Sequence, residues 1–305
     1  PYTYTDLQRF LISLESNDDV HRRALCETIA GNVCDMLTIT ERCENALESK
    51  NKPAIVLSAR IHPGESMTSC MIQGCIEYLL SDCLEAKRLR KAFIFIVVPM
   101  LNPDGVVHGN YRCSLAGSDL NRRYKDTNSS LYPTITAFKE LFQATLTRRP
   151  ILLFLDLHGH SKVKNAFLYG CDLTYQQDKV VKFLSQNMSE EDINNRRLYA
   201  RIYPKILCTL SKANYNGYFS YNDCAFAIQK NKGGTGRVFG YRECGIVGSY
   251  TIEASFCGNG DNNEKKLLKK MDNSLAASNR ASQAVVGSGA NAAASLASNS
   301  AMNSD

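Results

Sequence analysis

The 305-residue sequence lacks several features that define other classes of protein. Its longest apolar stretch, AFIFIVVPML at 92–101, is well short of the roughly 20 residues that a membrane-spanning helix needs. The 12 cysteines include no CxxC pair, which excludes a cysteine-type zinc finger. The 36 Lys and Arg exceed the 30 Asp and Glu only modestly and form no clustered basic patch. We therefore expect neither a membrane protein nor a nucleic-acid-binding protein.

The start of the sequence lacks a secretion signal, and its end has few bulky apolar residues. The first residues, PYTYTDLQRF, contain neither an initiating Met nor a secretory signal pattern, so we expect an internal piece of a longer protein that is not secreted. From Ser274 onward the chain is almost entirely Ser, Ala and Asn, and it cannot bury enough apolar surface to order itself. We expect a low-complexity, disordered tail over 274–305.

The cysteines are scattered and fall mostly within apolar runs, as at Cys70, Cys75 and Cys208. This distribution favours reduced, buried thiols in a reducing compartment over a disulfide framework.

Apolar strand-like runs alternate with helical patterns along the chain. Between the first two runs, Met67, Met71, Cys75, Tyr78 and Leu79 have helical spacing. The strand-like runs are 53–60, 92–98, 151–157 and 248–256. Further helices are expected from Pro133 and over 196–213, the second interrupted at Pro204. Loops are expected at 214–223 and 231–237. This alternation predicts an α/β fold with a mixed, largely parallel central sheet flanked by helices.

A candidate metal site lies where two of these strands end. His62 and Glu65 flank a Pro-Gly turn directly after the first strand, and such a turn can direct both side chains to one point. His158 follows the strand at 151–157, with Asp156 on the same strand face as a carboxylate that could orient it. His160 would share that face if the strand continued, but His158 is nearer the strand end. A His, Glu, His set is a common ligand combination for catalytic zinc.

Two further patterns suggest polar chemistry. Asn121 and Arg122 would make a clamp for a terminal carboxylate, although solvated loop charges would have the same sequence. Glu253 lies among apolar residues in the last strand, where alternation directs Tyr250 and Ile252 to the opposite face. A buried carboxylate is costly without a task or a partner, and general-base catalysis beside a metal is one such task.

Five ordered motifs resemble those of the zinc metallocarboxypeptidases. HPGES, LNPDGVVHGNYR, SDLNRRY, LDLHGHS and SYTIEASF occur in the family's order, and their details are similar to the cytosolic carboxypeptidase branch. PYTYTDLQRF also resembles the segment that opens that branch's catalytic domain. The resemblance covers roughly residues 1–260, apart from a poorly matching stretch at 172–195. It implies a catalytic domain over 1–270 with a zinc carboxypeptidase-like fold.

The resemblance also implies roles for individual residues. It implies one zinc ion per chain, bound by His62, Glu65 and His158. Arg112 matches the residue that polarises the scissile carbonyl, and Glu253 matches the general base. No residue could be matched to the mobile substrate-covering tyrosine of the digestive enzymes.

The substrate is also implied by this branch. Asn121 and Arg122 would hold the substrate's terminal carboxylate, and the last residue removed would be glutamate, from a polyglutamate side chain or the acidic tail of tubulin. That substrate implies a cytoplasmic protein and suggests association with microtubules or cilia. Arg237, in the glycine-rich stretch GGTGR, is the candidate for binding the terminal glutamate side chain, against the alternative of a solvated loop arginine.

Two other functions remain open at this level. An aspartoacylase-like zinc amidohydrolase uses a similar ligand set on small acylated amino acids, and the Asn121-Arg122 pair does not exclude it. A catalytically dead binder of acidic tails is the other alternative, although every ligand position and Glu253 are present.

Overall fold

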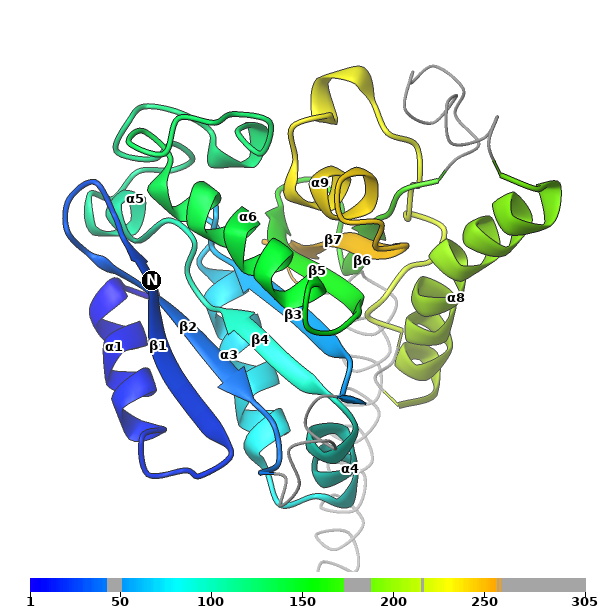
Figure 1. Cartoon of the computed structure of the whole chain (residues 1–305), viewed down its shortest axis with the longest axis horizontal. Coiled ribbons are helices and arrows are strands. Elements are labelled where there is room, and N and C mark those ends of the chain that lie inside the picture. Colours follow the sequence, from blue (N-terminus) through cyan, green and yellow to red (C-terminus); the bar gives the residue numbers. More distant parts are fainter. Residues whose placement is uncertain (43–50, 173–187, 215–216, 257, 259–305) are drawn as a thin grey trace, which may run out of the picture. The chain divides into compact units, whose positions relative to one another are not determined.

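A seven-stranded β-sheet forms the centre of the part of the chain that the structure describes (Figure 1). The structure is a computed structural model, and it describes residues 1–42, 51–172, 188–214, 217–256 and 258. The strands are β1 Val20–Glu27, β2 Val33–Ile39, β3 Ala54–Ala59, β4 Ile94–Val98, β5 Ile151–His160, β6 Ala166–Tyr169 and β7 Gly248–Ser255. The tail predicted at 274–305 and the domain boundary predicted at 270 lie outside the described residues, so both stay predictions.

The sheet order is β1-β2-β4-β3-β5-β7-β6. The four central strands, β4, β3, β5 and β7, are parallel to one another. The strands β1, β2 and β6 pair antiparallel at the two edges. The predicted mixed, largely parallel sheet is therefore confirmed, and its four predicted strands are the four central ones.

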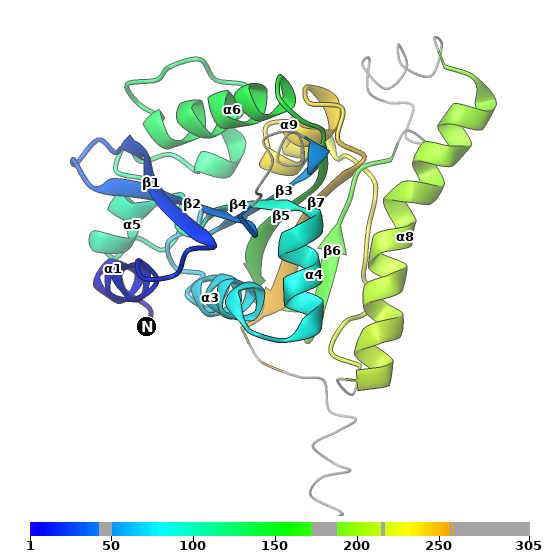
Figure 2. The same cartoon turned by 60° about the horizontal axis from the view of Figure 1, so that its bottom comes forward.

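Helices cover both faces of the sheet. The helices are α1 Tyr4–Ser13, α3 Met67–Leu80, α4 Leu84–Ala92, α5 Pro103–Val107, α6 Pro133–Leu146, α8 Glu190–Asn214 and α9 Gly236–Arg242, with 3-10 turns η1 Leu120–Arg122 and η2 Lys230–Lys232. Figure 2 shows α6 and α9 on one side of the sheet and α1, α3 and α4 on the other. Two apolar clusters match these layers: one joins the sheet to α1, α3 and α8, and the other joins it to α6 and α9.

The central strands are apolar because both of their faces are buried. In β5, Phe154 packs in the cluster beneath α6 and α9, whereas Leu155 and Leu157 pack in the cluster on the opposite face. Helix α6 begins at Pro133, as predicted, since proline suits the first turn of a helix, where its missing N–H is not needed. These elements place the carboxyl ends of β3, β5 and β7 at one edge of the sheet.

Helix α3 was predicted correctly, but its spacing did not reveal which face is buried. The buried apolar side chains are Ile72, Ile76 and Leu79, whereas Tyr78 is exposed. Cys70 and Cys75 are also exposed, so the expectation of buried thiols is wrong for these two. Apolar residues also occur on its exposed side, as at Tyr78, and helical spacing alone therefore could not select its buried face.

The predicted interruption at Pro204 is wrong, because α8 runs through this proline without a break. A proline inside a helix has no N–H to donate to the carbonyl four residues earlier. Here that carbonyl belongs to Ala200, and the hydroxyl of Tyr250 in β7 donates a hydrogen bond to it at 3.0 Å. The neighbouring strand thus satisfies the acceptor that Pro204 leaves without its usual helical partner.

The loop predicted at 231–237 is partly wrong, because it contains the end of η2 and the start of α9 at Gly236. Gly236 is a close-approach position: a Cβ there would lie 2.9 Å from the ring of Tyr124. Within the described residues, no helix has the length and apolarity to cross a bilayer.

Candidate metal centre and binding pocket

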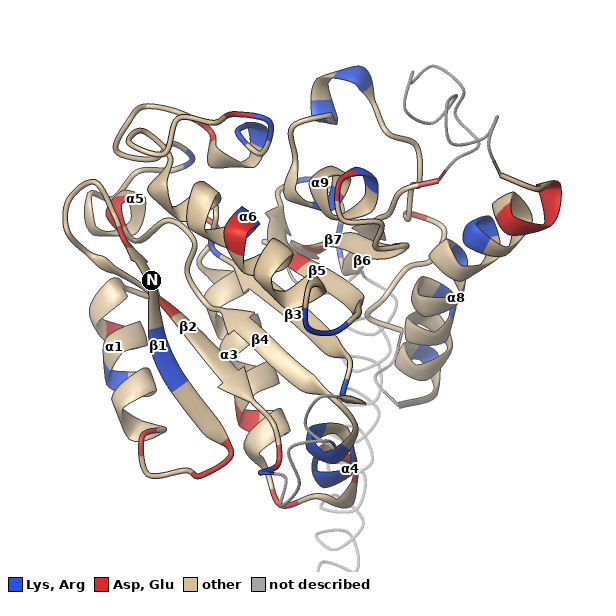
Figure 3. Cartoon of the chain, viewed as in Figure 1, with Lys and Arg blue, Asp and Glu red and all other residues tan. Residues whose placement is uncertain are grey.

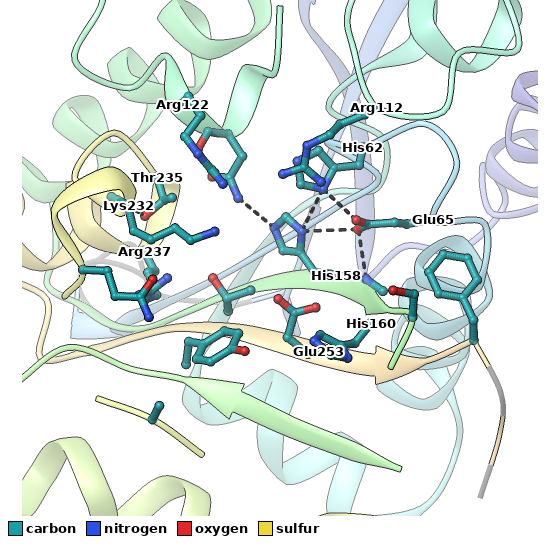
Figure 4. A pocket seen from close by; sticks show the side chains of 18 of the residues that line it. His62, Glu65, Arg112, Arg122, His158, His160, Lys232, Thr235, Arg237 and Glu253 are labelled. Carbon is teal, nitrogen blue, oxygen red and sulfur yellow. Dashed lines mark hydrogen bonds and ion pairs between the residues drawn. The ribbon is translucent and has the colours of Figure 1, made fainter. Parts of the chain in front are cut away.

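The carboxyl ends of three parallel strands bring the candidate site together, as expected for an α/β sheet (Figure 4). His62 and Glu65 lie in the turn after β3, and His158 lies near the end of β5. Glu253 of β7 is directly opposite His158 in the parallel register. All four side chains line one cavity of about 410 Å³.

His62, Glu65 and His158 are buried and converge on one point. His62 Nδ1 lies 2.7 Å from Glu65 Oε1, and His158 Nδ1 lies 3.2 Å from His62 Nδ1 and 3.3 Å from Glu65 Oε2. Two ligand atoms on a tetrahedral zinc ion, each about 2.0–2.1 Å from it, are separated by about 3.3 Å. Two imidazole nitrogens and a carboxylate oxygen facing one another therefore fit a bound cation, and zinc suits this donor set.

The outer nitrogens of both imidazoles contact carboxylates. His62 Nε2 lies 3.1 Å from Asp119 Oδ1, and His158 Nε2 lies 2.7 Å from Asp156 Oδ2. A proton on each Nε2 leaves each Nδ1 with a lone pair directed into the cluster, which is the arrangement that metal-binding histidines use. Asp156 contacts His158 as the sequence suggested, whereas sequence reasoning assigned no role to Asp119.

The electrostatics of the cluster favour a positive charge. Burial alone would lower the pKa of His158, but the carboxylates of Asp156 and Glu65 outweigh burial and raise that pKa well above its ordinary value. Burial alone would raise the pKa of Glu65, but hydrogen bonds from His158 and His62 outweigh it and hold that pKa far below its ordinary value. A cation at this point is therefore stabilised by its surroundings.

The turn that carries His62 and Glu65 is held rigidly by Arg60. This residue has a left-handed φ of 56°, and its buried guanidinium donates from Nε to the carbonyl of Pro63 at 2.7 Å and from Nη1 to Ser69 Oγ at 2.7 Å. Gly64 is required beside them, since a Cβ there would lie 2.7 Å from the carbonyl oxygen of Tyr111. The turn thus presents its two candidate ligands in a fixed orientation.

The choice between His158 and His160 is resolved by the hydrogen bonds of His160. Its Nδ1 accepts from the backbone N–H groups of Lys162 at 3.2 Å and Val163 at 2.9 Å. His160 lines the cavity but is not in the group of side chains that could share a metal ion. His158 is therefore the histidine that completes the cluster.

The residues expected to bind substrate lie on one wall of the cavity. Arg112 donates to Asp119 Oδ2 from Nε at 2.9 Å, and its Nη2 lies 2.8 Å from the same oxygen. Asn121 is buried, with Nδ2 3.2 Å from His158 Nε2 and Oδ1 accepting from the N–H of Gly236 at 3.0 Å. Arg122 donates from Nη1 to the backbone carbonyl of Asn121 at 2.8 Å. Arg122 thus contacts the backbone of Asn121, and the side-chain oxygen of Asn121 is held by the N–H of Gly236.

Arg237 lies in the first turn of α9, not in a loop as the sequence suggested. It is buried, donates from Nε to the carbonyl of Gly170 at 3.3 Å, and lies 5.5 Å from the ring centroid of Tyr169. Both Arg237 and Tyr169 line the cavity. A solvated loop arginine is therefore the wrong description of this residue.

Lys232 is a cavity residue that sequence reasoning missed. It is the last residue of η2. Figure 3 shows positively charged residues both in η2 and in α9, the helix that follows it in the chain. Burial, together with the nearby charges of Arg122, Arg112 and Arg237, lowers the pKa of Lys232. These four cations line the cavity, so it is suited to an anionic ligand.

Glu253 faces the cavity from β7, with the alternation that the sequence predicted. Tyr250 and Ile252 pack in the apolar cluster on the other face, whereas Thr251 and Glu253 line the cavity. Burial raises the pKa of Glu253 above its ordinary value.

Asp119 offers a test of the cluster as a metal site. We expect Asp119→Asn to weaken zinc binding by about 10- to 100-fold, because the amide would no longer fix the Nε2 proton of His62 and would lose the charge that supports it. Competition with a chromogenic chelator measures this change. Asp126→Asn is the matched control, since its carboxylate lies 3.9 Å from Arg123 in the same connection; equal zinc affinity in both variants would contradict the prediction.

Comparisons with known proteins agree with this geometry. A family model described as zinc carboxypeptidase matches residues 9–276. Cytosolic carboxypeptidase 2 of Mus musculus is 44% identical over 264 residues, covering 85% of this chain and 28% of that protein. Cytosolic carboxypeptidase 1 of Mus musculus is 42% identical over 270 residues, covering 85% of this chain and 21% of that protein. The chain thus spans about a quarter of the length of these relatives.

Solved structures support the fold. A metallo-carboxypeptidase from Burkholderia cenocepacia matches with a TM-score of 0.66 and 22% identity, covering 84% of this chain and 61% of that one. A carboxypeptidase A from Helicoverpa armigera matches with a TM-score of 0.56 and 16% identity, covering 83% of this chain and 64% of that one. The resemblance carried by the five motifs is confirmed, and since the family match extends over most of the sequence, this chain belongs to the zinc carboxypeptidase family.

Proposed function

We propose that this chain is the catalytic part of a zinc carboxypeptidase that removes glutamate from the ends of acidic protein tails or polyglutamate side chains, with tubulin as the protein substrate. The observation that carries this proposal is the cavity that joins the His62, Glu65 and His158 cluster to four cationic side chains. A terminal glutamate has two carboxylates, and a cavity lined with cations attracts such a group and stabilises it.

The cluster fits one zinc ion. Zinc bound there would lower the pKa of a coordinated water and polarise the substrate carbonyl. Glu253 takes a proton from the attacking water and passes it to the leaving amine, a role that suits a carboxyl group lining the same cavity as the cluster. Arg112 donates hydrogen bonds to the oxygen that becomes negatively charged, a role in which losing one donor costs roughly 10²–10³ in rate.

Arg122 accounts for the choice of a chain end. Within the described residues, Arg122 contacts other protein groups through Nη1. This nitrogen lies 2.8 Å from the carbonyl oxygen of Asn121 and 3.9 Å from Asp119 Oδ2. The rest of the guanidinium fork can bind the free α-carboxylate of a substrate. An internal peptide bond has no such charge, so this contact makes the enzyme an exopeptidase.

Arg237 accounts for the choice of glutamate as the last residue. It is held against Tyr169 and Gly170, which fixes its guanidinium on the cavity wall before substrate arrives. Holding the cation in place reduces the entropy lost on binding a carboxylate. Lys232 adds positive charge to the same wall.

The specificity proposal predicts a selective loss in Arg237→Ala. We expect kcat/KM for a glutamate-ended peptide to fall by roughly 10- to 100-fold, because a hydrogen bond to a charged group contributes about 1.5–3 kcal/mol. The value for a matched leucine-ended peptide should stay within a few-fold. Arg123→Ala, which removes an arginine that pairs with Asp126, is the control. An equal loss on both peptides would remove Arg237 from this role.

The substrate class is tested by mass spectrometry of polyglutamylated and genetically encoded tubulin-tail peptides after incubation with the zinc-loaded protein. We expect stepwise loss of terminal glutamate. An N-acyl amino acid assayed in parallel tests the aspartoacylase-like alternative, and peptide binding without turnover would favour a catalytically dead binder. The relatives are named cytosolic, and we propose the cytoplasm for this chain too, with microtubule or cilium association through tubulin.

A further inference from the structure

Two cysteines face each other across the hairpin at the edge of the sheet. Cys26 of β1 and Cys34 of β2 are direct partners in the antiparallel register. The register shifts just before them, between positions 24 and 26 of β1. Directly opposed residues in such a pair have Cα atoms about 4.5–5.5 Å apart, and disulfides span about 4.4–6.8 Å. The backbone therefore already holds the two cysteines at the separation that a disulfide needs.

The two thiols differ in a way that suits stepwise oxidation. Cys26 is partly exposed at the edge strand, whereas Cys34 is fully buried and its Sγ lies 3.4 Å from the carbonyl oxygen of Met100. The contact with the neighbouring Cys34 side chain lowers the pKa of Cys26. The same contact, with burial, raises the pKa of Cys34. Cys26 is therefore the thiol that more readily forms a thiolate and meets a dissolved oxidant.

We propose that Cys26 and Cys34 form a reversible disulfide when the protein meets hydrogen peroxide. The Cys26 thiolate attacks one peroxide oxygen, the O–O bond breaks, and Cys26 becomes a sulfenic acid while the other oxygen leaves as hydroxide, which takes up a proton to become water. The Cys34 sulfur then attacks Cys26 sulfur, and the sulfenic oxygen leaves as a second water with the Cys34 proton. Two thiols are thus oxidised, and one peroxide is reduced to two waters.

This bond would close the hairpin whose turn is anchored to α5. The carboxylate of Asp104, in the first turn of α5, accepts from Thr28 Oγ1, from the N–H of Ala30 at 3.1 Å and from Asn32 Nδ2 at 2.8 Å. A cross-link around this turn restricts the unfolded chain and leaves the folded pairing as it is. We expect the melting temperature of the oxidised protein to rise by about 5 °C.

Mass spectrometry provides a direct test, because both cysteines lie in one tryptic peptide, residues 24–42. The purified protein is treated with hydrogen peroxide, alkylated without reduction and digested. We expect this peptide to be lighter by two hydrogens and to carry no alkyl group. When the sample is reduced with dithiothreitol and alkylated again, the peptide should carry two alkyl groups. Oxidation of Met36 in the same peptide adds an oxygen and is distinguished by mass.

The variants separate this site from general thiol oxidation. Cys34→Ser should leave Cys26 as a sulfenic acid that dimedone traps, whereas Cys70→Ser, at an exposed thiol of α3, should leave the yield of the linked peptide unchanged. The proposal is overturned if Cys26 and Cys34 both remain alkylatable at a peroxide dose that oxidises Cys70 and Cys75, or if Cys26 links to a different cysteine. The wild-type result decides even if a variant fails to fold, and it does not depend on the proposed peptidase activity.

Discussion

Glu253→Gln is expected to reduce kcat/KM on glutamate-ended peptides by roughly 10²–10⁴, the usual contribution of a general acid-base residue. Glutamine preserves the shape of the side chain but can neither take the proton of the attacking water nor return it to the leaving amine. Zinc content should remain that of the wild type, since Glu253 is not in the cluster formed by His62, Glu65 and His158. Steady-state kinetics and metal analysis of the same preparation measure both quantities.

The stability of Glu253→Gln separates loss of chemistry from loss of fold. A carboxyl group whose folded pKa is raised disfavours the folded state once the pH exceeds its unfolded pKa, because folding then opposes its ionisation. A neutral glutamine avoids that cost, so the zinc-free variant at pH 7 should melt at the same temperature as the wild type or higher. Glu243→Gln, at an exposed carboxylate, is the matched control and should retain full activity. Wild-type turnover in Glu253→Gln would exclude the general-base role.

His158→Ala is expected to abolish zinc binding and, with it, all detectable peptide hydrolysis. The change removes one of the three candidate ligands and leaves the buried carboxylates of Asp156 and Glu65 without the imidazole that contacts both. Breaking such a buried pair costs about 3–5 kcal/mol, so the variant should also unfold at a lower denaturant concentration. Metal analysis after dialysis against a chelator, together with urea unfolding, measures the two effects.

Two histidine variants give this prediction its controls. His108→Ala alters an exposed residue at the end of α5 and should leave zinc content and activity unchanged. His160→Ala should retain zinc, because His160 accepts backbone hydrogen bonds and lies outside the cluster. Full zinc occupancy in His158→Ala, or loss of zinc in His160→Ala, would show that the ligand set is wrong.

The central part of the fold was predictable because its strands are buried on both faces. The apolar runs of β3, β4, β5 and β7 stand out in the sequence for that reason. The edge strands β1, β2 and β6 were missed; β1, for example, mixes exposed and buried positions and contains consecutive arginines at 22 and 23. Helix α1 was also missed, although Thr3 and Asp6 form the reciprocal cap that marks a helix start.

Some residues of the candidate site were predictable from the sequence and others were not. The strand-end residues His62, His158 and Glu253 were predictable because parallel strands gather their carboxyl ends at one edge. Asp119 and Lys232 come from 3-10 turns and connections, whose spacing does not say which side chains reach the cavity. The position of Asp119 within the SDLNRRY motif was the one available signal for it.

The hydrogen bond between Tyr250 and Ala200 depends on the proline at position 204. In an isolated helix this proline would leave a carbonyl with nothing to accept from inside α8. In the folded chain that oxygen accepts a hydrogen bond from β7, the strand that carries Glu253, so the missing bond in α8 becomes a contact between the helix and the sheet. A helix without this proline would keep the carbonyl of Ala200 for its own backbone and would hold β7 less firmly.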